Sequence, residues 1–151
     1  KLQVKRVDWQ TNRQLLSEIR VEVFVHEQGV PIEEEWDQWD ETSRHWLIYS
    51  EVKSAATAAS ESRPIGTARL TPQGQIGRMA VLEQHRSNGV GFHLLEAVIK
   101  EAELHFEQIY LHAQTHAIGF YQRAEFKATG PQFDEAGIPH QKMVRNSSAS
   151  A

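Results

Sequence analysis

The chain has 151 residues, of which 40% are apolar and 24% are charged, and its net charge at neutral pH is −4. These values predict one globular domain over residues 1–145, followed by a disordered tail at 146–151. The absence of cysteine excludes disulfides, zinc–thiolate sites and cysteine nucleophiles, and it fits a cytoplasmic setting. The acidic balance argues against nucleic-acid binding, and no apolar run approaches the about 20 residues of a membrane span.

The first half of the chain predicts one helix and four strands. The helix has an apolar stripe of helical period, with Thr11 as its N-cap, and the last two strands are joined by a turn at residues 71–74. A small polar stretch, Lys53–Arg63, predicts a surface loop. The elements are a strand at Gln3–Trp9, the helix at Asn12–Val25, and strands at His45–Val52, Ile65–Leu70 and Gln75–Leu82.

The second half predicts two helices and three strands. The longer helix has its apolar residues on one face and its charged residues on the other. Together with the first half, this order predicts an α/β fold with helices packed on a mixed sheet. The elements are a helix at Gly91–Phe106, a strand at Ile109–Gln114, a helix at His116–Ala124, and strands at Phe126–Thr129 and Lys142–Arg145 with a turn near residues 134–137.

The segment Arg86-Ser87-Asn88-Gly89-Val90-Gly91 lies between a predicted strand and the longer helix. Two glycines spaced by one residue permit a tight turn, and the following helix directs its free N–H groups at the loop. Such a loop suits a phosphate or pyrophosphate, although an ordinary glycine-rich turn has the same composition. The segment is not a Walker loop and is a poor match to the Rossmann pattern.

The segment Ala117–Phe126 begins just after a predicted strand and carries the adjacent pair Phe120-Tyr121. A helix here would bury Phe120 and could direct Tyr121 into a cleft. In isolation, packing at an interface is the better explanation of one tyrosine.

Taken together, the two segments resemble the GNAT superfamily of N-acetyltransferases. Arg86, Gly89 and Gly91 match its Q/R-x-x-G-x-G/A pattern, and Phe120-Tyr121 matches its Phe-Tyr pair. The chain departs from the pattern at Glu125, where many members have glycine, and at His116, where members often have asparagine. The stretch Val23–Pro31 resembles one bacterial branch of the superfamily.

The resemblance implies a GNAT-like, largely antiparallel sheet flanked by helices, and acetyl transfer from acetyl-CoA to a primary amine by direct attack. It implies that the loop holds the pyrophosphate, that the pantetheine follows the strand, and that Tyr121 is the general acid. A homodimer is possible. The expected acetyl-CoA residues are Met79, Ala80, Val81, Arg86, Ser87, Asn88, Gly89, Val90, Gly91, Phe92 and Phe120.

The run Glu33–Glu41 holds six carboxylates and two tryptophans and no basic residue. One interpretation is an acceptor-side loop that attracts a cationic amine, with Glu34, Glu35 and Asp37 as substrate-binding residues. The other is a solvated acidic loop whose tryptophans close the core.

The general base is left open, because the strand Gln75–Leu82 carries no carboxylate. Glu27, Glu83, His112 or a chain of water molecules are the candidates. The spacing of His112 and His116 resembles that of metal ligands, but with no obvious third ligand we expect no metal site. Two other functions remain open, a non-catalytic acyl-CoA sensor of the same fold and an interaction module.

Overall fold

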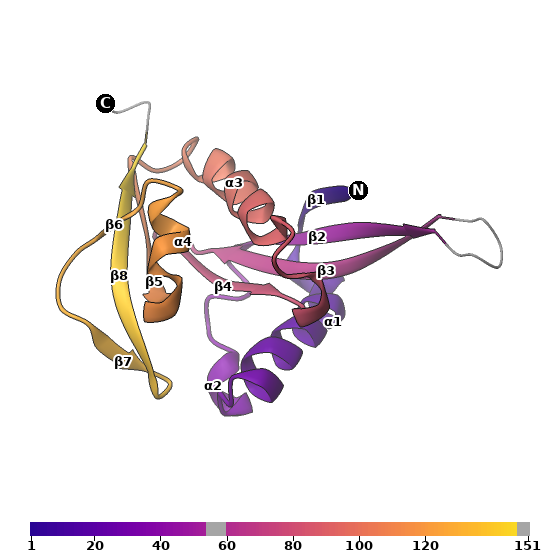
Figure 1. The fold of residues 1–151 in the computed structure, drawn as a ribbon, viewed down its shortest axis with the longest axis horizontal. Coiled ribbons are helices and arrows are strands. Elements are labelled where there is room, and N and C mark those ends of the chain that lie inside the picture. Colours follow the sequence, from indigo (N-terminus) through magenta and orange to yellow (C-terminus); the bar gives the residue numbers. More distant parts are fainter. Residues whose placement is uncertain (54–59, 148–151) are drawn as a thin grey trace.

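The computed structural model describes residues 1–53 and 60–147, and these residues form one mixed sheet flanked by helices (Figure 1). The strand order is β1-β2-β3-β4-β5-β8-β6, with β7 paired to β8, and only the β4–β5 pair is parallel. The strands are β1 (Leu2–Val7), β2 (Arg44–Lys53), β3 (Ser60–Leu70), β4 (Gln75–Val81), β5 (Gln108–Gln114), β6 (Lys127–Ala128), β7 (Phe133–Glu135) and β8 (Ile138–Asn146). The expected α/β architecture with a largely antiparallel sheet is confirmed.

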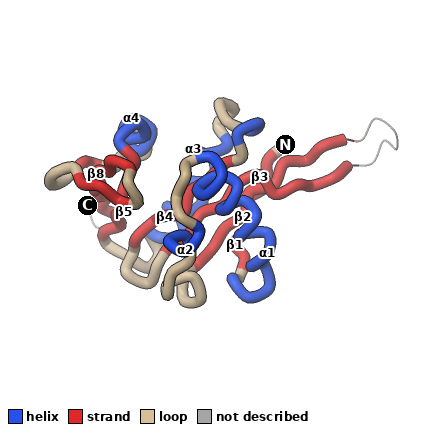
Figure 2. Tube along the Cα trace, turned by 90° about the horizontal axis from the view of Figure 1, so that it is seen from below, coloured by secondary structure: helices blue, strands red, loops and turns tan. Residues whose placement is uncertain are grey.

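Helices cover both faces of the sheet, as the view from below also shows (Figure 2). The longer ones are α1 (Trp9–Arg20) and α3 (Val90–Ala102). The others are η1 (Val21–Glu27), α2 (Ile32–Glu35), η2 (Glu83–His85), η3 (Thr115–Ala117) and α4 (Ile118–Gln122), where η1 is a π-helix and η2 and η3 are 3₁₀ turns.

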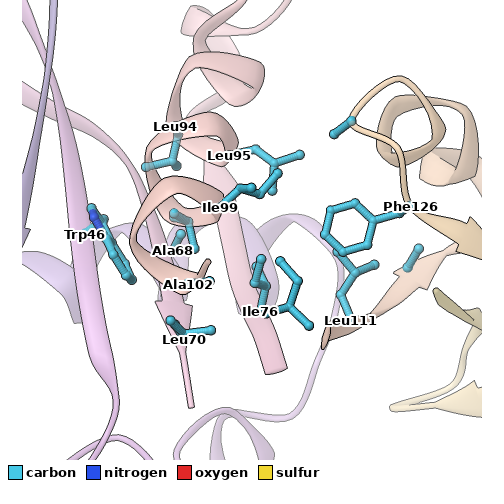
Figure 3. Close-up of a cluster of buried hydrophobic side chains, with 14 of the residues drawn as sticks. Trp46, Ala68, Leu70, Ile76, Leu94, Leu95, Ile99, Ala102, Leu111 and Phe126 are labelled. Carbon is cyan, nitrogen blue, oxygen red and sulfur yellow. The ribbon is translucent and has the colours of Figure 1, made fainter. Parts of the chain in front are cut away.

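The alternation of side chains along β2 explains why a hydrophobic cluster lies on each face of the sheet. Trp46 packs in the cluster beneath α3 (Figure 3), and Ile48 belongs to the same cluster. Leu47 packs in a second cluster with Leu16 and Ile19 of α1. Successive side chains of a strand point to opposite faces, so one hydrophobic run supplies both cores.

The first helix begins earlier than predicted and changes its hydrogen bonding near residue 20. Its N-cap is Asp8, whose Oδ1 accepts from the Thr11 N–H at 2.8 Å, so Thr11 is not the cap. From Val21 the segment predicted to stay helical continues as the π-helix η1. The wider turn changes the direction of each later side chain, and Phe24 and Gln28 line the cavity described below.

Pairing extends several strands beyond their predicted ends. Lys53 belongs to β2 and residues 60–63 belong to β3, so both ends of the predicted loop are strand; its remaining residues, 54–59, lie outside the described residues. β8 continues through Asn146, whose side chain accepts a hydrogen bond from Gln108, and the Ser147 N–H donates to Glu107 O at 2.7 Å. The ordered chain therefore passes the expected end at residue 145, and residues 148–151 are not described.

The helix α3 ends at Ala102 rather than near Phe106, because the N–H groups of His105 and Phe106 both donate to the Ala102 carbonyl and close the turn. Glu125, which precedes Phe126, has a φ of +66°. Glycine adopts that conformation without strain, and glutamate does not.

Candidate functional site

A β-bulge interrupts β4 at its centre. Arg69 pairs with Gly77 and Thr67 pairs with Ala80, so three steps along β4 match two along β3. Arg78 supplies the extra residue and has a φ of +50°, which is rare for a side chain of this size. The bulge aims Arg78 toward the loop after α2, where its Nη2 donates to Glu35 O at 2.8 Å.

β4 and β5 separate after two paired positions. Gln75 pairs with Tyr110 and Ile76 with Leu111, and the register ends there, so the later part of β4 has no ladder to β5. In Figure 1 the two strands run in clearly different directions. A cavity of about 520 Å³ lies where they part, lined by residues of η1, α2, β4, β5, α4 and β7. Backbone groups released from a ladder are available to a ligand.

The glycine loop precedes the N-terminus of α3. Ser87 and Gly89 have φ values of +70° and +76°, and no side chain caps the helix. The first intrahelical bond runs from the His93 N–H to Gly89 O, so the N–H groups of Val90, Gly91 and Phe92 have no intrahelical acceptor. Three free donors at the positive end of a helix suit an anion.

Phe120 connects this loop to the cavity. Its ring lies edge-on to Phe92 at 6.1 Å, and a Cβ added to Gly91 would lie 3.5 Å from its Cζ. Of the other residues expected to bind acetyl-CoA, Val90 and Ala80 are buried, Met79 and Val81 are partly buried, and Ser87 and Asn88 are exposed. These residues are distributed over β4, the loop before α3, the first turn of α3, and α4; a Cβ added to Gly91 would lie 3.9 Å from Val81, and their assignment to acetyl-CoA stays a prediction.

Arg86 takes a different position from the other loop residues. Its Nη1 and Nη2 donate to the two oxygens of Glu27 at 2.6 and 2.8 Å, and its Nε donates to Val81 O at 2.8 Å. Arg86 therefore joins the end of η1 to the end of β4, and its guanidinium is already paired.

Tyr121 reaches the cavity from α4. Its ring packs on Phe120 and Phe126, with centroids 5.0 and 6.1 Å away, and its hydroxyl has no hydrogen-bond partner among the described residues. Burial raises the pKa of Tyr121 to about 12, so the phenol keeps its proton at neutral pH.

The three side chains considered as the general base lie in different places. The hydrogen bond from Arg86 outweighs desolvation and lowers the pKa of Glu27, whose side chain does not line the cavity. Glu83 is exposed in η2 and does not line it either. His112 does line it, and its Nδ1 lies 2.9 Å from Oε1 of Glu135.

The acidic run is paired with three arginines that the local sequence does not reveal. Arg20 bonds Glu35 and Asp40, each at 2.8 Å, and Arg69 bonds Asp37 at 2.7 Å. Glu35 and Asp40 are both 3% exposed. The expectation of a solvated, purely acidic loop is therefore wrong for these residues, because their charge is neutralised inside the protein. Of the three expected acceptor-binding carboxylates, only Glu34 is exposed, at the edge of the cavity.

Within residues 1–53 and 60–147, no cluster of three or more histidine and carboxylate side chains could hold a metal ion. The same residues form no helix long and apolar enough to cross a membrane.

Comparison with known proteins places this arrangement in a family. A family profile described as an acetyltransferase (GNAT) domain matches residues 16–147. The chain is 35% identical over 133 residues to YjcF of Bacillus subtilis, named as an uncharacterized N-acetyltransferase, with 85% of this chain and 88% of the relative covered.

Solved structures agree with that match. Escherichia coli ElaA superposes with a TM-score of 0.80 at 26% identity, covering 97% of this chain and 100% of that one. An acyl-CoA N-acyltransferase from Pseudomonas aeruginosa gives 0.74 at 28% identity, covering 96% and 98%. The chain therefore belongs to the GNAT family of acetyltransferases.

Proposed function

We propose that the protein transfers an acetyl group from acetyl-CoA to a primary amine by direct attack. The observation that carries this proposal is the position of β4. Its residues 75–79 line the cavity that Tyr121 also lines, and its last residue, Val81, lies beside Gly91 at the uncapped α3 N-terminus. Family membership supports the transfer of an acyl group, and the arrangement of this chain's residues supports the finer assignment.

The free N–H groups of Val90, Gly91 and Phe92 suit the pyrophosphate of the donor, because they form a fixed array of donors with no competing side chain. The backbone of β4 beyond Ile76 suits the pantetheine arm, since its edge toward β5 has no ladder there. A backbone N–H near the bulge could stabilise charge on the thioester oxygen.

The acceptor must lose a proton and the departing sulfur must gain one. An alkylamine of pKa near 10.4 is neutral in only about one molecule in 2,500 at pH 7, so a base helps it to react. Tyr121 holds a proton at any neutral pH and faces the cavity, which supports its role as the donor to sulfur. Direct attack is consistent with a chain that has no cysteine to carry the acetyl group.

The test is the release of CoA thiol from acetyl-CoA across a panel of amines and peptide N-termini, with the product identified by mass. Thiol release that depends on an amine, with matching product mass, is the expected result. Binding of acetyl-CoA without turnover on any amine would instead indicate the acyl-CoA sensor. The absence of both binding and turnover would indicate an interaction module.

A further inference from the structure

The alternation of β5 places His112 on the opposite face of the sheet from Tyr121. Leu111 and Ala113 are buried in the cluster beneath α3, against which Tyr121 also packs. His112 therefore points to the other face, as does Gln114, which bonds Gln28 at the end of η1 at 2.9 Å. Both His112 and Tyr121 line the cavity where β4 and β5 part, so they approach it from opposite sides.

Glu135 of β7 forms a hydrogen bond with one ring nitrogen of His112. Its Oε1 lies 2.9 Å from Nδ1 of His112, and because a carboxylate only accepts, Nδ1 carries the hydrogen. The lone pair of the neutral ring is then on Nε2, which has no partner among the described residues. The hydrogen bond from His112 outweighs desolvation and lowers the pKa of Glu135, so the carboxylate is ionised at neutral pH.

Aromatic packing also restricts the orientation of the His112 ring. Phe133 lies edge-on to His112 with centroids 5.0 Å apart, and it stacks on His140 at 5.9 Å. Nδ1 of His140 donates to Ile138 O at 2.7 Å, and its Nε2 lies 3.8 Å from the second oxygen of Glu135. The strands β5, β8 and β7 thus hold one imidazole in one orientation.

We propose that His112 is the general base for the acceptor amine and that Glu135 is the positioning residue that keeps its Nε2 free. This assignment rests on the acetyl transfer proposed above. As the amine nitrogen bonds to the thioester carbonyl carbon, its proton passes to Nε2. The C–S bond breaks with its electron pair on sulfur, which takes the proton of Tyr121. The imidazolium then releases a proton and the phenolate regains one, so the protein returns to its starting state.

Several other charged or titratable groups border this pair and contribute to its pH dependence. Lys142 lies opposite His112 on β8, and its Nζ sits 5.0 Å over the ring of Tyr110. These groups are Tyr110 on β5, His140 and Lys142 on β8, Glu135 on β7, Arg69 on β3, Arg78 on β4, Glu34 and Glu35 on α2, Asp37 after α2, His116 in η3 and Tyr121 on α4.

The first test compares His112→Asn and Glu135→Gln with Asp134→Asn, a control that removes an exposed carboxylate from the same strand. We expect His112→Asn to lower kcat at pH 7 by ~10²–10⁴-fold, with the KM for acetyl-CoA unchanged and the loss shrinking at alkaline pH. Glu135→Gln should lower kcat less and move the acidic limb of kcat/KM to lower pH, because a neutral amide does not stabilise the imidazolium. Asp134→Asn should match the parent.

Parental kcat in His112→Asn would overturn the assignment of the base. An equal loss at every pH in Glu135→Gln would overturn the positioning role, because damage to structure alone does not move the limb.

A second readout needs no turnover. Nitrogen-15 chemical shifts report which ring nitrogen of neutral His112 carries the hydrogen. We expect the Nδ1–H form in the parent and a shift toward the Nε2–H form in Glu135→Ala. An Nε2–H ring in the parent contradicts the role of Glu135. If the parent released no thiol with any amine, the acetyl transfer itself would fail, and this measurement would still decide the positioning claim.

Discussion

Glu27 and Arg86 form a bidentate ion pair, with oxygen–nitrogen distances of 2.6 and 2.8 Å. The pair joins residues 59 positions apart, one at the end of the π-helix and one at the start of the glycine loop. It fixes the loop to the helix on the other face of the sheet. We therefore propose that Glu27 holds the glycine loop in place and is not the general base.

Glu27→Gln is expected to raise the KM for acetyl-CoA about two- to fivefold, because a partly exposed pair contributes at most about 1 kcal/mol, and to leave kcat nearly unchanged. Steady-state kinetics with either substrate varied gives both values. Glu22→Gln, an exposed carboxylate on the same helix 3.4 Å from His26, is the control and should match the parent. A large fall in kcat with an unchanged KM for acetyl-CoA would contradict this account and make Glu27 a candidate general base again.

The glycine loop predicts a stabilisation by ligand. CoA at 100 times its Kd should raise the free energy of unfolding by about 2.7 kcal/mol, seen as a higher Tm. Gly89→Val should abolish the rise, because its φ of +76° and its place beside the free N–H groups both disfavour a branched side chain.

Gly130→Val is the matched control for that experiment. Gly130 has a φ of +75° and open space around it, but it lies in the loop after β6. It should lower the Tm of the free protein by a similar amount and keep the rise with CoA. If Gly89→Val kept the full rise, the phosphate would not be bound at this loop.

The buried ion network predicts a large loss of stability in Asp40→Asn. The carboxylate bonds Arg20 at 2.8 Å and Arg69 at 3.0 Å, and its neutralisation takes from each buried guanidinium one of its two carboxylate partners. Breaking such a pair costs about 3–5 kcal/mol, measurable by urea unfolding at pH 7. Glu41→Gln, an exposed neighbour, should change little.

The same residue predicts a pH dependence. Burial alone would raise the pKa of Asp40, but hydrogen bonds and charges from Arg20 and Arg69 outweigh it and hold the pKa below its usual value. The stability from this group is therefore complete above the ordinary carboxyl range near 4 and is lost as the pH falls through the lower folded-state value. The parent should lose stability more steeply than Asp40→Asn in this acidic range, and parallel curves would contradict the account.

Of the three carboxylates expected to attract a cationic acceptor, only Glu34 is exposed. Glu34→Gln should raise the KM for a positively charged amine about two- to fivefold and leave the KM for acetyl-CoA unchanged, because an exposed charge acts weakly through solvent. Glu33→Gln, also exposed but not lining the cavity, is the control. Equal increases of this KM in Glu34→Gln and Glu33→Gln would indicate that the amine responds only to the net charge of the segment.

The sheet, the long helix and the glycine loop could be predicted because each has a local signature. The stripe of α3 and the apolar run of β2 follow the periods of helix and strand. Gly89 and Gly91 mark a turn that only small residues allow.

The ion network and the His112–Glu135 pair could not be predicted in the same way. Arg69 bonds Asp37 across 32 positions and His112 bonds Glu135 across 23, and no local pattern links such residues. The positive φ of Arg78 comes from the register of β3 against β4, which residue types do not specify. Neither interpretation of the acidic run, as an acceptor-binding loop or as a solvated loop, includes the buried ion pairs that Glu35 and Asp40 form.

The most direct test of the acetyl transfer in this cavity is the kcat of Tyr121→Phe at saturating acetyl-CoA and amine. The ring contacts with Phe120 and Phe126 survive the change, and the lost hydroxyl has no hydrogen-bond partner among the described residues, so stability and the KM for acetyl-CoA should change little. The account predicts a fall in kcat of ~10²–10⁴-fold, because the departing sulfur loses its proton donor. Parental kcat from neutral to alkaline pH would contradict it and would remove Tyr121 from the mechanism.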